Sequence, residues 1–153
     1  RDLHSCPTRR SPDLRYVIDR WRKQANMYLV ATNHESAFFA GDTALTDDTT
    51  RFVKRELRER QLDVALLPIG YAPKWKAESF SRGHLTSLDA LTLFERLDAR
   101  YLIPYHWGTF NHVTASAYDA IRELREHVKT HARGTDVRVL EPAESLHVAS
   151  LPA

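Results

Sequence analysis

Short apolar segments that alternate with amphipathic helical segments are the feature that most constrains the fold of this chain. Two of them are predicted strands: Asp63–Ile69 has the composition of a buried strand, and Tyr101–Tyr105 is a strand whose Pro104 indicates a strand end. Between them, a capping box at Thr86–Asp89 opens a helix that continues to about Ala99, with its apolar residues on one stripe. Strands that alternate with helices predict an α/β layered domain.

The remaining segments extend this pattern to the order β-β-α-β-α-β-α-β-β. Asn33–Ser36 predicts the turn of a β-hairpin, and Asp47 or Asp48 can cap the first helix. Tyr71–Leu85 is expected to be a long loop, and loops of this length in compact domains usually have a function. The further predicted elements are strands over Asn26–Thr32, Ala37–Ala40, Val137–Leu140 and Ser145–Val148, and helices from Asp47 to about Arg60 and over Ser116–Ala132.

Length and helical patterning together predict a single domain with one core. The chain has 153 residues, enough for such a core, and the intervals between the helical stripes leave no room for a linker. We expect the apolar stripes to face the core. They comprise Val53 and Leu57 in the first helix, Leu91, Phe94 and Leu97 in the second, and Tyr118, Ile121, Leu124 and Val128 in the third.

Charge and cysteine content narrow the classes of function. The formal net charge is +2, too small to predict a nucleic-acid or anionic-membrane partner. No apolar run reaches the roughly 18 residues of a membrane-spanning helix, and no signal-peptide pattern is present. The single cysteine, Cys6, allows no internal disulfide. We therefore expect a protein of a reducing, cytoplasmic compartment.

The first 14 residues differ from the rest of the chain. The sequence begins with arginine, and Arg1–Leu14 has neither a helical nor a strand period. The segment closely resembles a translated sequencing adapter, and a disordered native terminus is the alternative. We therefore expect a non-native head over residues 1–14 and a single domain over residues 15–153.

Polar residues follow three predicted strands at the ends where α/β sheets bind ligands. Gly41–Thr43 ends the second strand, Tyr71–His84 follows the third, and His106 follows the fourth. Carboxylate and imidazole groups both bind zinc, so Asp42 and His106 are candidate metal ligands. A turn carboxylate and a hydrogen-bonded structural histidine are the alternatives at these two positions.

Three motifs in this order resemble the metallo-β-lactamase superfamily. They are FFAGDTALTD, DVALLPIG and LIPYHWGTF, with a histidine-containing loop before a helix between the last two. The branch that they resemble most contains L-ascorbate-6-phosphate lactonase and N-acyl-phosphatidylethanolamine-hydrolysing phospholipase D. The resemblance covers about Asn26 to Phe110. It implies that this chain is the C-terminal half of an αββα sandwich that binds two divalent metal ions, zinc above all, with manganese or iron as alternatives.

The resemblance also implies roles for individual residues. Asp42 occupies the position of the aspartate that bridges both ions, and His106 that of a terminal ligand to one of them. His84 occupies the position of a histidine near the substrate, which implies substrate binding or proton transfer; a role as the cap of the following helix is the alternative. The implied reaction is hydrolysis of an ester, lactone or phosphodiester bond by a metal-bound hydroxide. The implied substrate is a small molecule or a lipid-like ester or phosphoester.

Side chains of the long loop are candidates for binding this substrate. Lysine and arginine there can bind an anionic group, and a solvated surface is the alternative. The candidates are Tyr71, Lys74, Lys76 and Arg82.

The chain departs from the family pattern in two respects. The upstream HxHxDH motif is absent, as is the intermediate ligand histidine, and His34 in the hairpin turn does not match it. Catalytic zinc needs three protein ligands, whereas this chain offers two. We therefore expect a fragment that is inactive without the missing N-terminal half. The alternative is a non-catalytic binding module that retains the fold.

Overall fold

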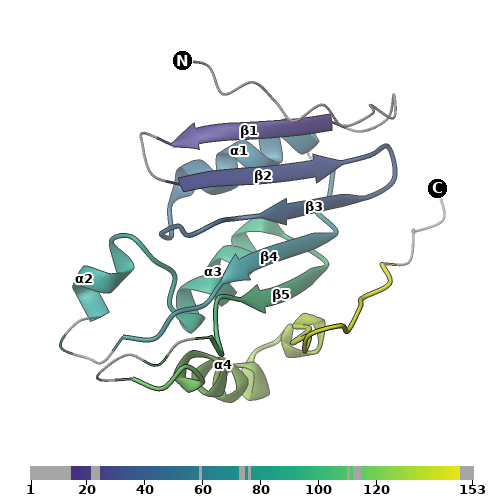
Figure 1. Cartoon of the computed structure of the whole chain (residues 1–153). Coiled ribbons are helices and arrows are strands. Elements are labelled where there is room, and N and C mark those ends of the chain that lie inside the picture. The colour runs from purple at the N-terminus through teal and green to yellow at the C-terminus, as the bar shows by residue number, and fades with distance from the viewer. Residues whose placement is uncertain are drawn as a thin grey trace.

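One five-stranded sheet organises the molecule, in the order β1-β2-β3-β4-β5 (Figure 1). The computed structural model describes residues 15–21, 25–58, 60–72, 75, 77–109, 111 and 115–148, so the predicted head over residues 1–14 lies outside the described part. The strands are Arg15–Trp21 (β1), Ala25–Ala31 (β2), Ser36–Phe39 (β3), Val64–Pro68 (β4) and Tyr101–Tyr105 (β5). The helices are Asp47–Leu57 (α1), Ala77–Ser81 (α2), Ser87–Leu97 (α3) and Asp119–Thr130 (α4), with a 3-10 helix at Gly134–Asp136 (η1).

The sheet changes strand direction at β3. β1, β2 and β3 are antiparallel neighbours, whereas β3, β4 and β5 are parallel and are connected through α1 and α3. The predicted hairpin is confirmed: the Thr32 hydroxyl accepts hydrogen bonds from the backbone amides of His34 and Glu35, which closes the turn between β2 and β3. Parallel strands end at the same edge, so the segments that follow β3, β4 and β5 emerge side by side (Figure 1).

The core lies between the sheet and its helices. Phe38, Leu67 and Leu102, from the three parallel strands, are fully buried. The apolar residues predicted to face inward on α1 and α3 are buried as well, as are Ile121 and Leu124 of α4. The α/β class predicted from the sequence is therefore confirmed. None of the described helices has the length and apolar character needed to cross a bilayer.

The opposite face of the sheet carries aromatic residues that contact solvent. The side chains of Tyr28 and Phe39 are 37% and 38% exposed, and their rings lie 6.3 Å apart on neighbouring strands. Phe39 also stacks on Tyr105 of β5, with 4.8 Å between ring centroids. No helix in the described part of the chain covers this face, which we call the open face of the sheet (Figure 1).

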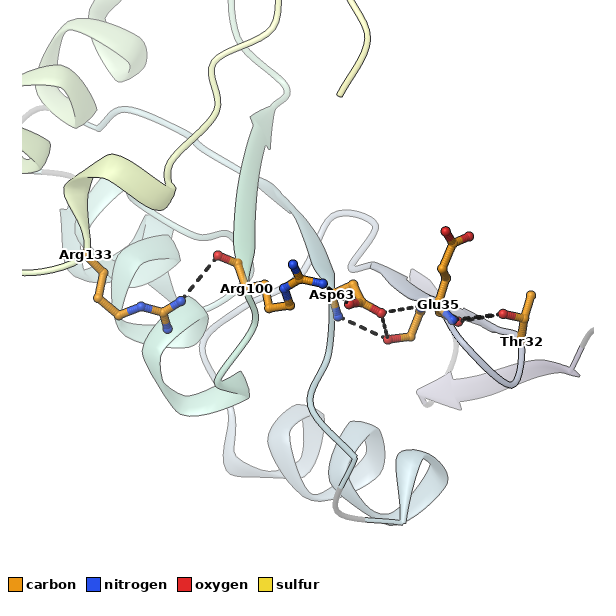
Figure 2. A network of polar contacts seen from close by, with 6 residues as sticks. Thr32, Glu35, Asp63, Arg100 and Arg133 are labelled. Carbon is orange, nitrogen blue, oxygen red and sulfur yellow. Dashed lines mark hydrogen bonds and ion pairs between the residues drawn. The ribbon is translucent and has the colours of Figure 1, made fainter. Parts of the chain in front are cut away.

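A buried carboxylate joins the beginnings of the parallel strands (Figure 2). Asp63, just before β4, accepts hydrogen bonds from the backbone amide (2.8 Å) and the hydroxyl (3.1 Å) of Ser36 in β3. Its other oxygen lies 3.0 Å from the guanidinium of Arg100, just before β5. Arg133 in turn donates to the backbone oxygens of Ala99 and Arg100. These contacts fix the relative positions of three strands at the edge opposite Asp42.

The predicted beginning of α1 is wrong by one or two residues. The cap is Thr46, whose side chain accepts a hydrogen bond from the backbone amide of Thr49 (3.4 Å). Asp47 and Asp48 lie in the first turn, where negative charge is favourable beside the helix N-terminus. The helix ends at Leu57, before the predicted end near Arg60, because the next residue takes a left-handed backbone conformation.

Other differences concern elements that are short or rich in charge. The predicted loop over Tyr71–Leu85 contains α2, whose five residues are too few to give a helical period. The sequence does not predict β1, because charged residues interrupt its apolar ones. The two predicted C-terminal strands are wrong: Val137 makes only an isolated bridge to Leu102, and Ser145–Val148 forms no strand.

The predicted inner stripe of α4 also needs one correction. The helix begins at Asp119, three residues later than predicted, so Tyr118 lies at the N-cap position rather than on the helix. Its side chain is 53% exposed, and its ring meets the ring of Trp107 edge-on at 6.3 Å. Tyr118 therefore contributes to the loop after β5 and not to the core.

Candidate metal centre

Asp42 lies in the loop that follows β3, and the preceding glycine fixes this loop. Gly41 has a φ of +65°, and a Cβ at this position would lie 2.4 Å from the backbone oxygen of Asn26. Only glycine combines this conformation with such a close approach. From the other side, the Tyr105 hydroxyl donates a hydrogen bond of 2.5 Å to the backbone oxygen of Gly41. The loop that carries Asp42 is thus held by β2 and by β5.

Tyr105 is suited to this task because its phenol stays protonated. Burial raises the pKa of Tyr105 well above its ordinary value, and the negative charge of Asp42 adds to this effect. A protonated phenol can donate to a backbone oxygen, whereas a phenolate cannot. The stacking of Tyr105 on Phe39 fixes the ring from the open face of the sheet.

His84 contacts Asp42 directly. Its Nδ1 lies 2.7 Å from Oδ1 of Asp42, and both side chains are partly exposed. The imidazole stacks on the ring of Phe80 in α2, with centroids 4.8 Å apart and an angle of 27°. The backbone amide of His84 also donates to the backbone oxygen of Phe80 (3.0 Å). Helix α2 therefore orients the histidine toward the loop after β3.

The alternative role of His84 as a helix cap is wrong. Thr86 caps α3: its hydroxyl accepts from the backbone amide of Asp89, and the carboxylate of Asp89 accepts from the backbone amide of Thr86. Gly70 forms a bridge with Thr86 and donates to the backbone oxygen of Leu85. The predicted capping box is confirmed, and it leaves the imidazole of His84 available to Asp42.

His106 immediately follows β5 at the same edge of the sheet. Its φ of +71° lies in the left-handed region, which is costly for a residue with a Cβ. Its side chain is exposed, and its ring centroid lies 6.4 Å from that of Tyr105. A strained backbone at the end of a parallel strand is typical of residues that a fold positions for function.

A pocket of about 560 Å³ opens beside these residues. Both His84 and His106 line it, together with the aromatic residues Tyr71, Phe80 and Trp107. The structure thus joins Asp42 to His84 by a hydrogen bond, and His84 to His106 through a shared pocket. We predict that the ligand atoms of Asp42 and His106 approach to within about 5 Å, the span of two ligands on one zinc ion.

The other predicted substrate contacts lie in different settings. Tyr71 lines the pocket. Arg82 forms an exposed ion pair with Glu78 one turn earlier, with 3.1 Å between the charged atoms. Lys74 and Lys76 lie outside the described residues. Binding of an anionic group by these cations stays a prediction.

Sequence reasoning did not identify the roles of Tyr105 and Trp107. The Trp107 indole donates to the backbone oxygen of Pro104 (3.3 Å), which fixes the loop after β5. The alternation within Tyr101–Tyr105 was the available signal for Tyr105, because it places this ring on the open face with Ile103. Its partner, Gly41, is 64 residues away in the chain.

The side chains at this edge are of types that bind divalent cations, but they are too few for a complete metal site. Asp42 offers a carboxylate and His106 an imidazole, ligand types that zinc, manganese and iron all accept. However, the described residues contain no group of three or more His, Cys, Asp or Glu side chains that could hold a metal ion. Asp42 and His106 are therefore candidates for one part of a metal centre rather than for a complete one.

Several metal-dependent hydrolases are similar in sequence to most of this chain. A metal-dependent hydrolase of Deinococcus radiodurans is 36% identical over 108 residues, covering 71% of this chain and 38% of the relative. Hydrolases with the same name from Methanopyrus kandleri and Heliobacterium modesticaldum are 34% and 31% identical, covering 77% and 78% of this chain and 44% of each relative. The chain thus spans less than half the length of these relatives.

Solved structures share the fold. The metallo hydrolase Igni18 from Ignicoccus hospitalis superposes with a TM-score of 0.60 at 22% identity, covering 89% of this chain and 53% of that one. An isothiocyanate hydrolase from Delia radicum gut bacteria gives a TM-score of 0.59 at 18% identity, covering 82% and 45%. A family model described as the beta-lactamase superfamily domain matches residues 7–107, beginning within the predicted head. The chain therefore belongs to the metallo-β-lactamase superfamily.

Proposed function

We propose that the protein that contains this chain is a metal-dependent hydrolase, with Asp42 and His106 as metal ligands and His84 as a catalytic residue. The observation that carries this proposal is the hydrogen bond between His84 and Asp42 at the sheet edge where His106 also emerges. The metal-dependent hydrolases among its relatives support the same reaction class.

Each side chain has a distinct task in this proposal. Divalent metal ions, when bound, lower the pKa of water and so supply the nucleophile of hydrolysis. Asp42 provides negative charge to hold the cations, and His106 provides a neutral nitrogen donor. His84 is oriented through Nδ1 by Asp42, which leaves Nε2 as the nitrogen that can transfer a proton to the leaving group.

We propose two zinc ions in the complete site, with manganese or iron as alternatives. Catalytic zinc needs at least three protein ligands, and the described residues bring together fewer. The remaining ligands would come from a histidine-rich segment such as HxHxDH in a longer protein, in keeping with relatives of more than twice the matched length. The substrate we propose is a small or lipid-like ester, lactone or phosphodiester, and this chain alone would be inactive.

The test measures metal content and hydrolysis separately in the full-length protein. Asp42→Asn and His106→Ala are expected to lower the bound metal, measured by elemental analysis after dialysis. His84→Ala is expected to keep the metal and to lower kcat by roughly a hundredfold or more, the usual contribution of a general acid. Esters, lactones and phosphodiesters with a nitrophenol leaving group form the substrate panel.

Asp47→Asn is the matched control, because Asp47 is an exposed aspartate of α1 that pairs with Arg96. It is expected to change neither metal content nor rate. A full-length protein that binds no metal and hydrolyses no member of the panel would contradict the proposal and favour a binding module.

A further inference from the structure

We propose that the pocket beside His84 and His106 binds an uncharged, apolar group, with an aromatic ring as its best occupant. The role of this pocket as a substrate site rests on the proposed function. Under that function, the apolar group is the part of the substrate next to the bond that is cleaved. The inference narrows the substrate class from any ester or phosphoester to those with an apolar substituent.

Aromatic and small residues line the pocket. Its lining includes the rings of Tyr71, Phe80 and Trp107 and the small residues Ala117 and Ala120. Its volume of about 560 Å³ lies within the roughly 300–1,000 Å³ typical of small-molecule sites. Aromatic walls bind rings through offset stacking and edge contacts in addition to the burial of apolar area.

The wall formed by α2 is fixed before any ligand binds. A Cβ on Gly70 would lie 2.2 Å from the ring of Phe80, so this ring packs directly against the backbone after β4. The same ring stacks on the imidazole of His84, with 4.8 Å between centroids. Phe80 therefore links the wall of the pocket to the histidine that contacts Asp42.

The wall formed by the loop after β5 is equally constrained. The Trp107 indole donates to the backbone oxygen of Pro104 and meets the ring of Tyr118 edge-on. The backbone amide of Gly108 donates to the backbone oxygen of Ala117 (2.9 Å), which joins this loop to the segment before α4. Walls that are already ordered lower the entropic cost of binding a rigid ring.

Charge argues for an uncharged occupant. The described residues that line the pocket include two histidines and the hydroxyls of Thr109 and Ser116, but no Lys, Arg, Asp or Glu. Arg82, the described cation of this loop, is paired with Glu78. A carboxylate placed in the metal-free pocket would lose hydration without gaining a cationic partner among the described residues that line it, which is costly. An uncharged ring loses little hydration and gains apolar contact.

The test compares two ligands of nearly the same shape, one neutral and one anionic. Binding of 1-naphthamide and 1-naphthoate to the full-length protein is measured by titration calorimetry, with and without added zinc. We expect the amide to bind and the carboxylate to bind at least roughly tenfold more weakly in the metal-free protein. Ala117→Phe fills the pocket with a ring of its own, so it is expected to weaken binding of the amide by roughly tenfold or more.

Tyr28→Thr is the matched control, because it removes an exposed aromatic ring from the open face of the sheet and leaves the pocket intact. It is expected to leave the affinity for the amide unchanged. Circular dichroism of both variants identifies any loss of fold. Phe80→Leu, which keeps an apolar side chain but loses the ring, is a second pocket variant, and it is expected to weaken binding of the amide.

The outcomes separate this inference from the proposed function. Absence of amide binding, equal binding of the carboxylate without metal, or a loss of affinity in Tyr28→Thr but not in the pocket variants would overturn the inference. If the protein binds metal and hydrolyses the panel in such a case, the proposed function stands. If the protein binds the amide in the pocket but holds no metal, the inference about the apolar pocket stands and the proposed hydrolase function fails.

Discussion

Gly41 shapes the loop that carries Asp42. Its backbone is left-handed, and a Cβ added there would lie 2.4 Å from the Asn26 oxygen, which leaves no room for a side chain. We expect Gly41→Ala to lower the free energy of unfolding by roughly 1–3 kcal/mol, measured by urea denaturation. In the full-length protein it should also lower the affinity for metal, because Asp42 moves with the loop.

Gly83→Ala is the matched control for this substitution. A Cβ on Gly83 would meet no atom within 4 Å, so its effect on stability should stay within about 0.5 kcal/mol. Equal effects of the two substitutions would contradict the role of Gly41.

The hydroxyl of Tyr105 is expected to act through the same loop. Tyr105→Phe keeps the ring that stacks on Phe39 but removes the donor to the Gly41 oxygen. The expected loss of stability is about 1 kcal/mol, the usual net value of one hydrogen bond. In the full-length protein, Tyr105→Phe should lower the metal affinity, measured by competition with a chelator. Tyr28→Phe is the control and should leave this affinity unchanged. Unaltered metal affinity in Tyr105→Phe would show that the hydroxyl does not position Asp42.

Motifs in the sequence predicted three candidate site residues, Asp42 and His106 as residues that follow strands and His84 through the family resemblance. The structure places His84 in contact with Asp42 and on the same pocket as His106, and their roles stay predictions. Tyr105 and Gly41 could not be paired from the sequence, because a contact across 64 residues depends on the order of strands in the sheet. Of the aromatic residues that line the pocket, Tyr71 was a candidate from the sequence, whereas the place of Trp107 beside Tyr118 depends on how distant segments pack.

At the scale of elements, Asp63 joins the three parallel strands. Asp63→Ala would leave the Ser36 amide and the Arg100 guanidinium without their shared partner in a largely buried setting. We expect the free energy of unfolding to fall by about 3 kcal/mol, because the buried Ser36 amide loses its acceptor and the charge-assisted bond to Arg100 is lost. Thermal or urea denaturation measures the change.

Asp47→Ala is the control for Asp63→Ala. The ion pair between Asp47 and Arg96 is exposed on both sides, so its loss should cost less than about 1 kcal/mol. A smaller loss of stability in Asp63→Ala than in Asp47→Ala would contradict the inference that Asp63 holds the three parallel strands together.

The elements that the sequence predicts well are those whose signals are local. The capping box and the apolar stripe of α3 lie within one helix, so both were read from the sequence and both are confirmed. β1 was missed because its identity depends on pairing with β2 rather than on its own composition. The predicted C-terminal strands fail because only Val137 reaches β5, through one isolated bridge.

At the scale of the whole molecule, the open face of the sheet is the main liability of the 153-residue chain on its own. Tyr28 and Phe39 expose aromatic surface that a second layer of an αββα sandwich would cover. We expect this chain alone to self-associate in sedimentation experiments and to bind zinc weakly, because exposed apolar patches drive association and two ligands do not complete a zinc site.

A substitution on each face separates the causes of this association. Phe39→Thr should reduce it, whereas Leu88→Thr, which replaces an exposed leucine of α3 on the helical side, should not. A monomer of the unaltered chain with stoichiometric zinc would contradict both expectations.

The change of strand direction at β3 has a consequence for the order of folding. The β2–β3 hairpin closes through a tight turn, whereas pairing of β3 with β4 must bring Ser36 and Asp63 together across 27 residues, and β5 requires a second crossover. Short loops close faster than long ones, so the hairpin should form first and the parallel pairs later. Asp42 and His106 follow strands on the two sides of β4, so they should meet only in the last stage. A nascent chain would therefore complete its core before these two side chains come together.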